Sequence, residues 1–174
     1  RYLGQEGFGY FTTIVAFMQF FGVLVDFGLQ MTTGTLIARP GANEEKIFNN
    51  IFSLRFFSSL AVLLIIITIS FFLPYPEIIK KGLALIAFSF FFVSLQSIFI
   101  SALQKNLAAS KVAIAEVLNR STLLLGMVLA IAFNFNLLFI ILAVVISNLV
   151  NLIILWLGTK KFYCLRFRFD WPIW

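Results

Sequence analysis

The sequence lacks several of the residue types and motifs on which catalytic and metal sites depend. It contains no histidine, which excludes a histidine metal site and a histidine-based catalytic triad. Its single cysteine, Cys164, cannot form an internal disulfide. Neither GxxxxGKS nor GxxxxGKT occurs, which excludes ATP hydrolysis by a phosphate loop. With no nucleophile–base pair and no cluster of metal ligands, the sequence predicts a protein that is not an enzyme and needs no cofactor.

Charge is also scarce, because apolar residues make up 61% of the 174 positions and charged residues only 11%. Five apolar runs are each long enough to cross a bilayer, which takes about 20 residues of helix. These runs are 8–29, 51–73, 82–103, 112–133 and 137–157. No soluble core could bury five such segments in so short a chain. The sequence therefore predicts an all-α, polytopic membrane helical bundle whose short connections make an up-and-down order, with lipid rather than nucleic acid around it.

Lysine and arginine are distributed unevenly over the two sides of this bundle. Eight of them follow the first, third and fifth runs and a ninth, Arg55, lies just inside the second run on the same side, whereas three (Arg1, Lys80 and Lys81) fall on the other side. Loops rich in Lys and Arg stay in the cytoplasm, so the bias places the C-terminal tail in the cytoplasm and Arg1 outside. The Lys80–Lys81 pair runs against this rule.

An odd number of spans puts the two ends of the chain on opposite sides of the membrane. The sequence begins with Arg1, and no cleavable signal precedes the first run. One further helix upstream would return the start to the cytoplasm. We therefore interpret the chain as a fragment that lacks its first span, with residues 159–174 as a cytoplasmic lead-in to a missing second part.

Polar residues inside the runs are spaced by three or four, which puts them on shared helix faces. Examples are Gln19, Gly22 and Asp26 in the first run, Ser94 with Ser97 in the third, and Asn148 with Asn151 in the fifth. Most lie from mid-membrane towards the cytoplasm, a pattern that suggests a polar cavity open to that side. Two alternatives are helix ends that project into water and small polar residues that pack helices together.

The charged residues differ in their expected depth. Arg120 follows Lys111 by nine residues, about 13 Å of helix rise, and approaches the midplane. A charge there costs roughly 2.5–3.5 kcal/mol, so Glu116 and Arg120, at i and i+4 beside Asn119, form the best intramembrane site candidate. Asp26 and Arg55 are expected near the cytoplasmic edge, where both can extend to water.

Several short motifs resemble those of a known transporter family. Arg1-Tyr-Leu-Gly-Gln-Glu-Gly-Phe-Gly9, then Asp26-Phe-Gly-Leu29 and Ile37-Ala-Arg39, resemble the opening of bacterial Wzx-type polysaccharide (O-antigen) flippases. These belong to the multidrug/oligosaccharidyl-lipid/polysaccharide exporter superfamily. Phe167-Arg-Phe-Asp170 looks like the linker between the two six-helix lobes of this family. The resemblance assigns residues 1–158 to helices two to six of the N-terminal lobe.

The resemblance implies alternating access by two lobes around a central cavity in the bacterial inner membrane. The implied cargo is a polyprenyl-pyrophosphate-linked oligosaccharide, moved to the outer leaflet for surface polysaccharide synthesis. Arg55 and Arg120 would offer positive charge to the pyrophosphate, and Asp26 or Glu116 would take up a coupling proton or sodium ion. The missing helix and second lobe, and a polysaccharide polymerase, would be protein partners. Gln19, Ser97 and Asn148 complete the set of pathway candidates.

Three other interpretations of the function remain open. A drug/cation antiporter or a peptidoglycan-precursor flippase could use the same scaffold. A membrane assembly subunit without transport activity would use its polar stripes only for helix–helix contacts. Cysteine accessibility at Ser97 and Asn148 distinguishes this last case from a water-filled pathway.

Overall fold

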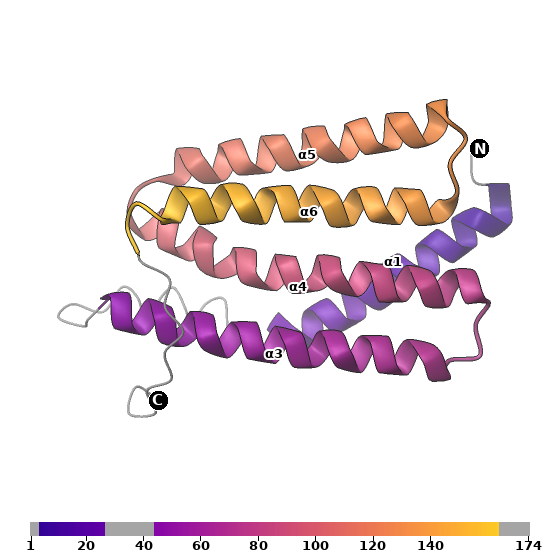
Figure 1. Cartoon of the computed structure of the whole chain (residues 1–174), viewed down its shortest axis with the longest axis horizontal. Helices are drawn as coiled ribbons and strands as arrows, with labels where there is room; N and C mark the ends of the chain where they lie inside the picture. Colours follow the sequence, from indigo (N-terminus) through magenta and orange to yellow (C-terminus); the bar gives the residue numbers. More distant parts are fainter. Residues whose placement is uncertain (1–3, 27–43, 164–174) are drawn as a thin grey trace.

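The computed structural model describes residues 4–26 and 44–163, and in them it has five helices, of which the last four are joined by short turns (Figure 1). The helices are α1 (Gly4–Asp26), α3 (Glu44–Phe72), α4 (Glu77–Lys105), α5 (Ala109–Ala132) and α6 (Leu137–Thr159). Each of them overlaps one of the apolar runs in the sequence. The prolines at 74 and 76 separate α3 from α4, because proline cannot continue the helical hydrogen-bond ladder.

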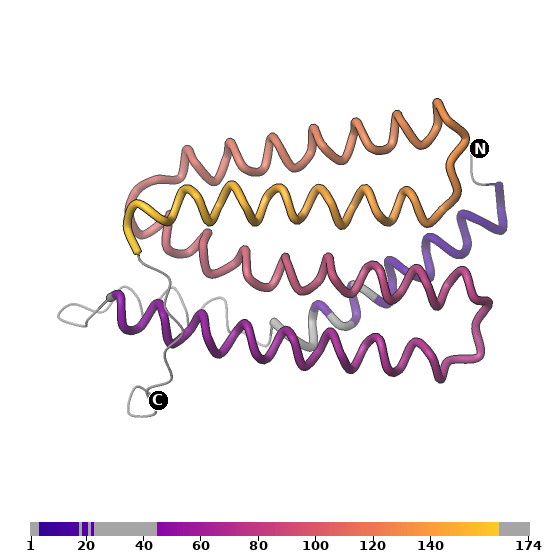
Figure 2. The backbone as a smooth tube through the Cα atoms, in the orientation of Figure 1, coloured from indigo at the N-terminus to yellow at the C-terminus, as the bar shows by residue number. Residues whose placement is uncertain are grey.

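Four of the helices lie side by side in the order α5, α6, α4, α3, and α1 crosses this row obliquely (Figures 1 and 2). The extensive contacts join α4 to α6, α5 to α6 and α3 to α4, while α1 packs against α4. Helices that are consecutive within 44–163 run antiparallel, so α4 and α6 run parallel to each other. The all-α membrane bundle predicted from the sequence is confirmed.

Each helix in the row is long and apolar enough to cross a membrane. Their 23–29 residues correspond to about 35–43 Å of helix, against roughly 30 Å of hydrocarbon. Large apolar side chains, among them Phe57, Phe72 and Leu124, are exposed on the outside of the bundle, as lipid contact requires. The protein is a multi-pass membrane protein.

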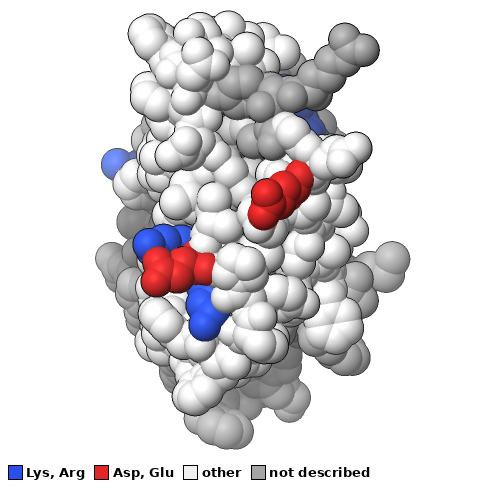
Figure 3. Space-filling view, turned by 90° about the vertical axis from the view of Figure 1, so that its right-hand side faces the viewer, with Lys and Arg blue, Asp and Glu red and all other residues white. Residues whose placement is uncertain are grey.

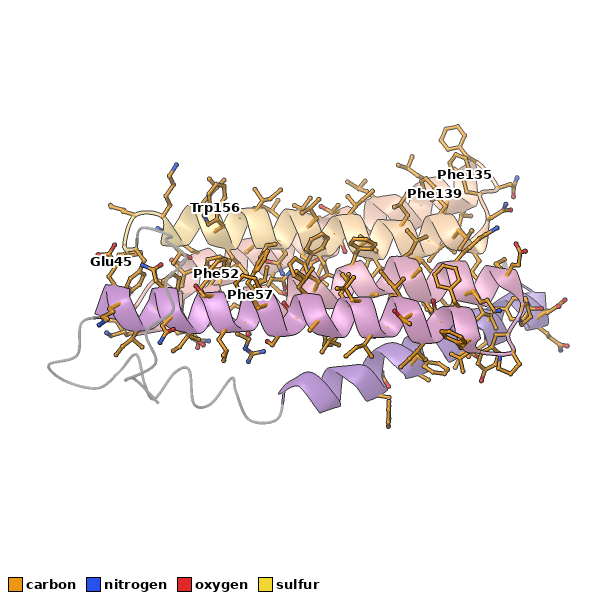
Figure 4. The ribbon with its side chains drawn as sticks, turned by 60° about the horizontal axis from the view of Figure 1, so that its bottom comes forward. Glu45, Phe52, Phe57, Phe135, Phe139 and Trp156 are labelled. Carbon is orange, nitrogen blue, oxygen red and sulfur yellow. The ribbon has the colours of Figure 1, made fainter. Side chains whose placement is uncertain are left out.

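Aromatic side chains close the end of the bundle at which α4 and α6 finish. Phe48 is buried and packs its ring against that of Tyr163, with 4.7 Å between the ring centres. Asn106 donates a hydrogen bond to the Tyr163 hydroxyl at 3.2 Å. Figure 4 shows Glu45 and Trp156 at this end and Phe135 and Phe139 at the other. Tyr163, which follows α6, thus contacts both α3 and the end of α4.

Two glycines allow close approach between helices. At Gly82 an added Cβ would overlap the tip of Ile14 and touch Ile141, so this glycine lets α1, α4 and α6 converge. At Gly126 it would lie 2.6 Å from the Cβ of Ala143, closer than real Cβ atoms approach. The α5–α6 interface therefore depends on a glycine facing an alanine.

Two helix ends carry the same turn with different residues at its strained position. Asn134 follows α5 at φ 52°, and Phe135 N–H donates to Ala130 C=O at 2.9 Å, the bond that defines a Schellman motif. Leu107 follows α4 at φ 53°, with the equivalent bond from Ala108 to Leu103. Asparagine tolerates this left-handed conformation, whereas leucine does not.

Replacing Leu107 by glycine is expected to stabilise the protein by about 0.5–1 kcal/mol, because the strain of roughly 1–2 kcal/mol disappears and only part is lost to unfolded-chain entropy. The side chain is 94% exposed, so its removal breaks no packing. Unfolding by detergent titration measures the change. Leu124→Gly, at an exposed position inside α5, is the matched control and should lower stability by about 1 kcal/mol. A loss of stability in Leu107→Gly would contradict the prediction.

More of the described cations lie at the end of the bundle that contains Tyr163 than at the other end. Five lysines lie at the Tyr163 end: Lys46, Lys105, Lys111, Lys160 and Lys161. At the opposite end Lys81 pairs with Glu77 at 3.0 Å, and Lys80 donates to the Phe71 carbonyl at the end of α3. Figure 3 shows that this second end is mostly uncharged, with acidic and basic side chains close together. Lys80 and Lys81, which run against the charge rule, are thus engaged in local contacts.

Candidate functional site

Polar side chains of three helices meet at one level, near the middle of the row. Arg55 of α3 contacts Ser94 of α4. Two residues further along α4, Gln96 is hydrogen-bonded to α6 at Asn148 and Asn151. We call these five residues the polar belt. The predicted α6 stripe of Asn148 and Asn151 therefore faces Gln96, which was not on the predicted α4 stripe, whereas Ser94 of that stripe faces α3.

Arg55 is buried, with 1% of its surface exposed. Its Nη1 lies 3.5 Å from the Ser94 hydroxyl oxygen. The prediction that the Arg55 side chain extends to water is wrong, because α4 packs against this face of α3 and covers it.

The α4–α6 part of the belt is a hydrogen-bonded helix contact. Gln96 Nε2 donates to the Asn148 carbonyl at 2.8 Å, and Asn148 Nδ2 donates to the Ser89 hydroxyl at 2.6 Å. Asn151 Nδ2 lies 3.4 Å from Gln96 Oε1. Asn151 Oδ1 is buried, and no described residue donates a hydrogen bond to it. For these residues the structure favours the helix-packing interpretation over a water-filled cavity.

Glu116 and Arg120 form an ion pair on α5, with 2.9 Å between Arg120 Nε and Glu116 Oε1. Lys111 donates to the Gly158 carbonyl at 3.0 Å, and Gly126 packs on Ala143, which together set the register of α5 against α6. In this register Arg120 lies at the level of the polar belt. The two arginines that the sequence placed at different depths therefore share one level, on opposite sides of α4 and α6.

The ion pair faces away from the rest of the bundle. The Arg120 side chain is 73% exposed and that of Glu116 is 49% exposed. Val117 and Leu124, nearby on α5, are each 63% exposed. A charge at mid-membrane costs roughly 2.5–3.5 kcal/mol in lipid. We therefore expect water or another protein segment, not lipid, to contact this face of α5. A guanidinium so presented can bind phosphate oxygens through two parallel hydrogen bonds.

The other candidates from the sequence are more scattered. Asn119 is half-buried on α5, between the two charged residues. Ser97 is half-buried on α4, where its hydroxyl donates to the Ser94 carbonyl. Gln19 is exposed on α1, which crosses the row instead of joining it. Asp26 ends α1, and its side chain lies outside the part of the chain that the structure describes, as does the predicted linker beyond Tyr163.

A pocket at the end opposite Tyr163 was not predicted from the sequence. Its volume is about 590 Å³, and it lies between the start of α1, the start of α4 and the α5–α6 turn. Its lining residues are Glu6, Gly7, Tyr10, Ile78, Asn134, Phe135, Asn136 and Leu137. They come from three separate segments, so no local pattern in the sequence could have indicated the pocket.

Comparison with known proteins identifies one family. Residues 1–172 match the family model described as "Polysaccharide biosynthesis protein". No curated protein and no solved structure matches the chain. The family match spans all five helices.

Proposed function

Because this chain belongs to the polysaccharide biosynthesis protein family, we propose that it is part of a flippase for lipid-linked oligosaccharides. Its cargo is a polyprenyl-pyrophosphate-linked repeat unit, carried across the bacterial inner membrane for surface polysaccharide synthesis. The Lys-rich end of the bundle faces the cytoplasm, in line with the positive-inside rule. The pocket at the opposite end then faces the outer side.

The observation that carries this proposal is the exposed Glu116–Arg120 pair at the middle of α5. The Arg120 guanidinium binds the pyrophosphate of the cargo as it passes the level of the polar belt. Glu116, one turn away, holds the guanidinium in place when no cargo is bound and releases it when the pyrophosphate competes. A proton or sodium ion at Glu116 would couple this exchange to transport.

The exposed face of α5 also supports a two-lobe arrangement. The carrier presents Arg120 to a water-filled cavity between this bundle and a second lobe, which removes the cost of an ion pair in lipid. Movement of the two lobes gives the cavity access first to one side of the membrane and then to the other. Arg55, buried between α3 and α4, has a supporting role, adding positive charge at the same level.

Translocation of a fluorescent polyprenyl-pyrophosphate-linked disaccharide by the full-length protein in proteoliposomes tests the proposal. Arg120→Ala is expected to slow translocation about tenfold or more, since a hydrogen bond to a charged group is worth roughly 1.5–3 kcal/mol. Leu124→Ala, exposed on the same helix, is the matched control and should keep the wild-type rate. Glu116→Gln should weaken the dependence on a proton or sodium gradient.

Two results would overturn this function. One is wild-type translocation by Arg120→Ala. The other is a wild-type protein that moves a lipophilic cation but not the lipid-linked sugar, which would favour a drug/cation antiporter. Cysteine accessibility at Asn148 and Ser97 adds an independent measure, because a subunit without transport activity would keep both positions closed to water.

A further inference from the structure

The pocket opposite Tyr163 lies beyond the apolar middle of the bundle. Its wall is formed by the first turns of α1 and α4 and by the turn between α5 and α6. Figure 4 shows Phe135 and Phe139 at this end, far along the bundle from Trp156. Its volume of about 590 Å³ falls within the roughly 300–1,000 Å³ typical of sites for small ligands.

The lining combines hydrogen-bonding groups with a flat aromatic wall. Glu6 offers carboxylate oxygens and accepts a hydrogen bond from the Tyr10 hydroxyl. Asn134 and Asn136 each add an amide, which can donate and accept. Phe135 adds an aromatic ring. Donors, acceptors and a ring face together match a sugar, whose hydroxyls need both kinds of partner and whose C–H face packs on an aromatic surface.

The turn that supplies these groups is held in shape by its own backbone. Asn134 takes the left-handed position of the Schellman motif, and the N–H of Phe135 is bonded to Ala130. The Phe135 ring packs against Phe139 of α6, with 4.3 Å between ring centres. It keeps 42% of its surface exposed. The aromatic surface is therefore in place before any ligand arrives.

The charge of the pocket distinguishes a sugar from a phosphate. No lysine or arginine is among the described residues that line it, and Glu6 is acidic. The nearby lysines are engaged elsewhere, Lys81 with Glu77 and Lys80 with the Phe71 carbonyl. Among the described lining residues a pyrophosphate would meet a carboxylate and no cation, whereas neutral hydroxyls would find hydrogen-bond partners.

We infer that this pocket binds uncharged sugar rings of the exported oligosaccharide at the end of the bundle where they leave the membrane. The inference rests on the proposed function, because that function makes this end the exit side. Two separate sites then bind the pyrophosphate and the glycan of the cargo. Arg120 contacts the pyrophosphate at mid-membrane, and the pocket contacts the glycan at the surface.

Saturation-transfer NMR on the full-length protein in nanodiscs tests the inference. The probes are neutral di- and trisaccharides of glucose, galactose and N-acetylglucosamine, with inorganic pyrophosphate as the anion probe. Binding of at least one saccharide is expected, and Phe135→Leu is expected to weaken it about fivefold through loss of the ring face. Glu6→Gln should weaken it to a similar degree. Asn134→Gly, which keeps the turn because glycine favours the left-handed position, should also weaken it.

Matched controls separate the pocket from its surroundings. Phe72→Leu removes an exposed ring at the same end of the bundle that is not among the lining residues, and Glu77→Gln removes a nearby carboxylate outside the pocket. Both should bind saccharide like the wild type. The inference is overturned if no saccharide binds, if pocket and control variants bind equally, or if pyrophosphate displaces the sugar.

The saccharide-binding experiment can fail while the translocation experiment succeeds, and the reverse. If Arg120→Ala lowers translocation but the pocket variants bind sugar normally, the flippase proposal stands and the pocket inference fails. If the wild type translocates no lipid-linked sugar but the pocket variants lose saccharide binding, the pocket is a sugar site of a protein with another role.

Discussion

Replacing Arg120 by glutamate is expected to reduce transport about a hundredfold and to lower the amount of folded protein in the membrane. The change removes the guanidinium and puts a second carboxylate one turn from Glu116, where the charges now repel. Two like charges one turn apart destabilise α5 where an ion pair stabilised it, so less folded protein is expected. Translocation rate and the yield of monodisperse protein on size-exclusion chromatography measure the two effects separately.

Exchanging Glu116 and Arg120 distinguishes the effect of the ion pair on folding from the effect of Arg120 on transport. Glu116→Arg combined with Arg120→Glu restores an ion pair at the same spacing, with the order of charges reversed and slightly less favourable. The yield of folded protein should return close to the wild-type level. Transport should stay low, because the guanidinium has moved a full turn along α5. Full recovery of transport in the exchanged protein would mean that only the pair matters, and Arg120 would lose its assigned contact with pyrophosphate.

Replacing Gly126 by leucine is expected to separate α5 from α6 and to destabilise the bundle by about 1–3 kcal/mol or more. An added Cβ alone would lie 2.6 Å from the Cβ of Ala143. That atom is fixed to the backbone and cannot rotate aside, so the helices must move apart. Because α5 is held mainly by α6, Arg120 would move with it and transport should fall as well. Detergent-titration unfolding and translocation report the two consequences.

Gly9→Ala is the matched control for this change. An added Cβ at Gly9 meets nothing within 4 Å among the described residues, and the position lies inside α1. Stability should therefore rise, by up to about 1 kcal/mol, through helix propensity alone. A Gly126→Leu protein as stable as the wild type would show that α5 is not held by close contact with α6.

The helices could be predicted from the sequence because bilayer thickness sets a length that apolar runs reveal directly. Apolar runs do not by themselves give the helix ends. Residues 44–50 are largely polar, and counting apolar residues alone places the start of this span at Ile51. In the structure these residues, nearly two turns of helix, belong to α3, and Asn49 and Asn50 are buried. Arg55 is covered by α4, and the pattern within one helix does not show which neighbour covers a residue.

Only contacts between residues close in sequence could be predicted for the candidate site. Spacing of four along a helix brings Glu116 and Arg120 together whatever surrounds them, and the structure has that pair. Periodicity shows which residues share a face, but not which neighbour covers that face. The structure supplies this second fact, since α6 covers one side of α5 and leaves the ion pair exposed.

Tyr163 links the end of α6 to α3 and α4. Its ring packs on Phe48 of α3, and its hydroxyl is held by Asn106 at the end of α4. A pull on the chain beyond this residue is therefore shared among three helices, and α6 cannot be drawn away by itself. These three helices are therefore expected to move together when the chain beyond Tyr163 is displaced.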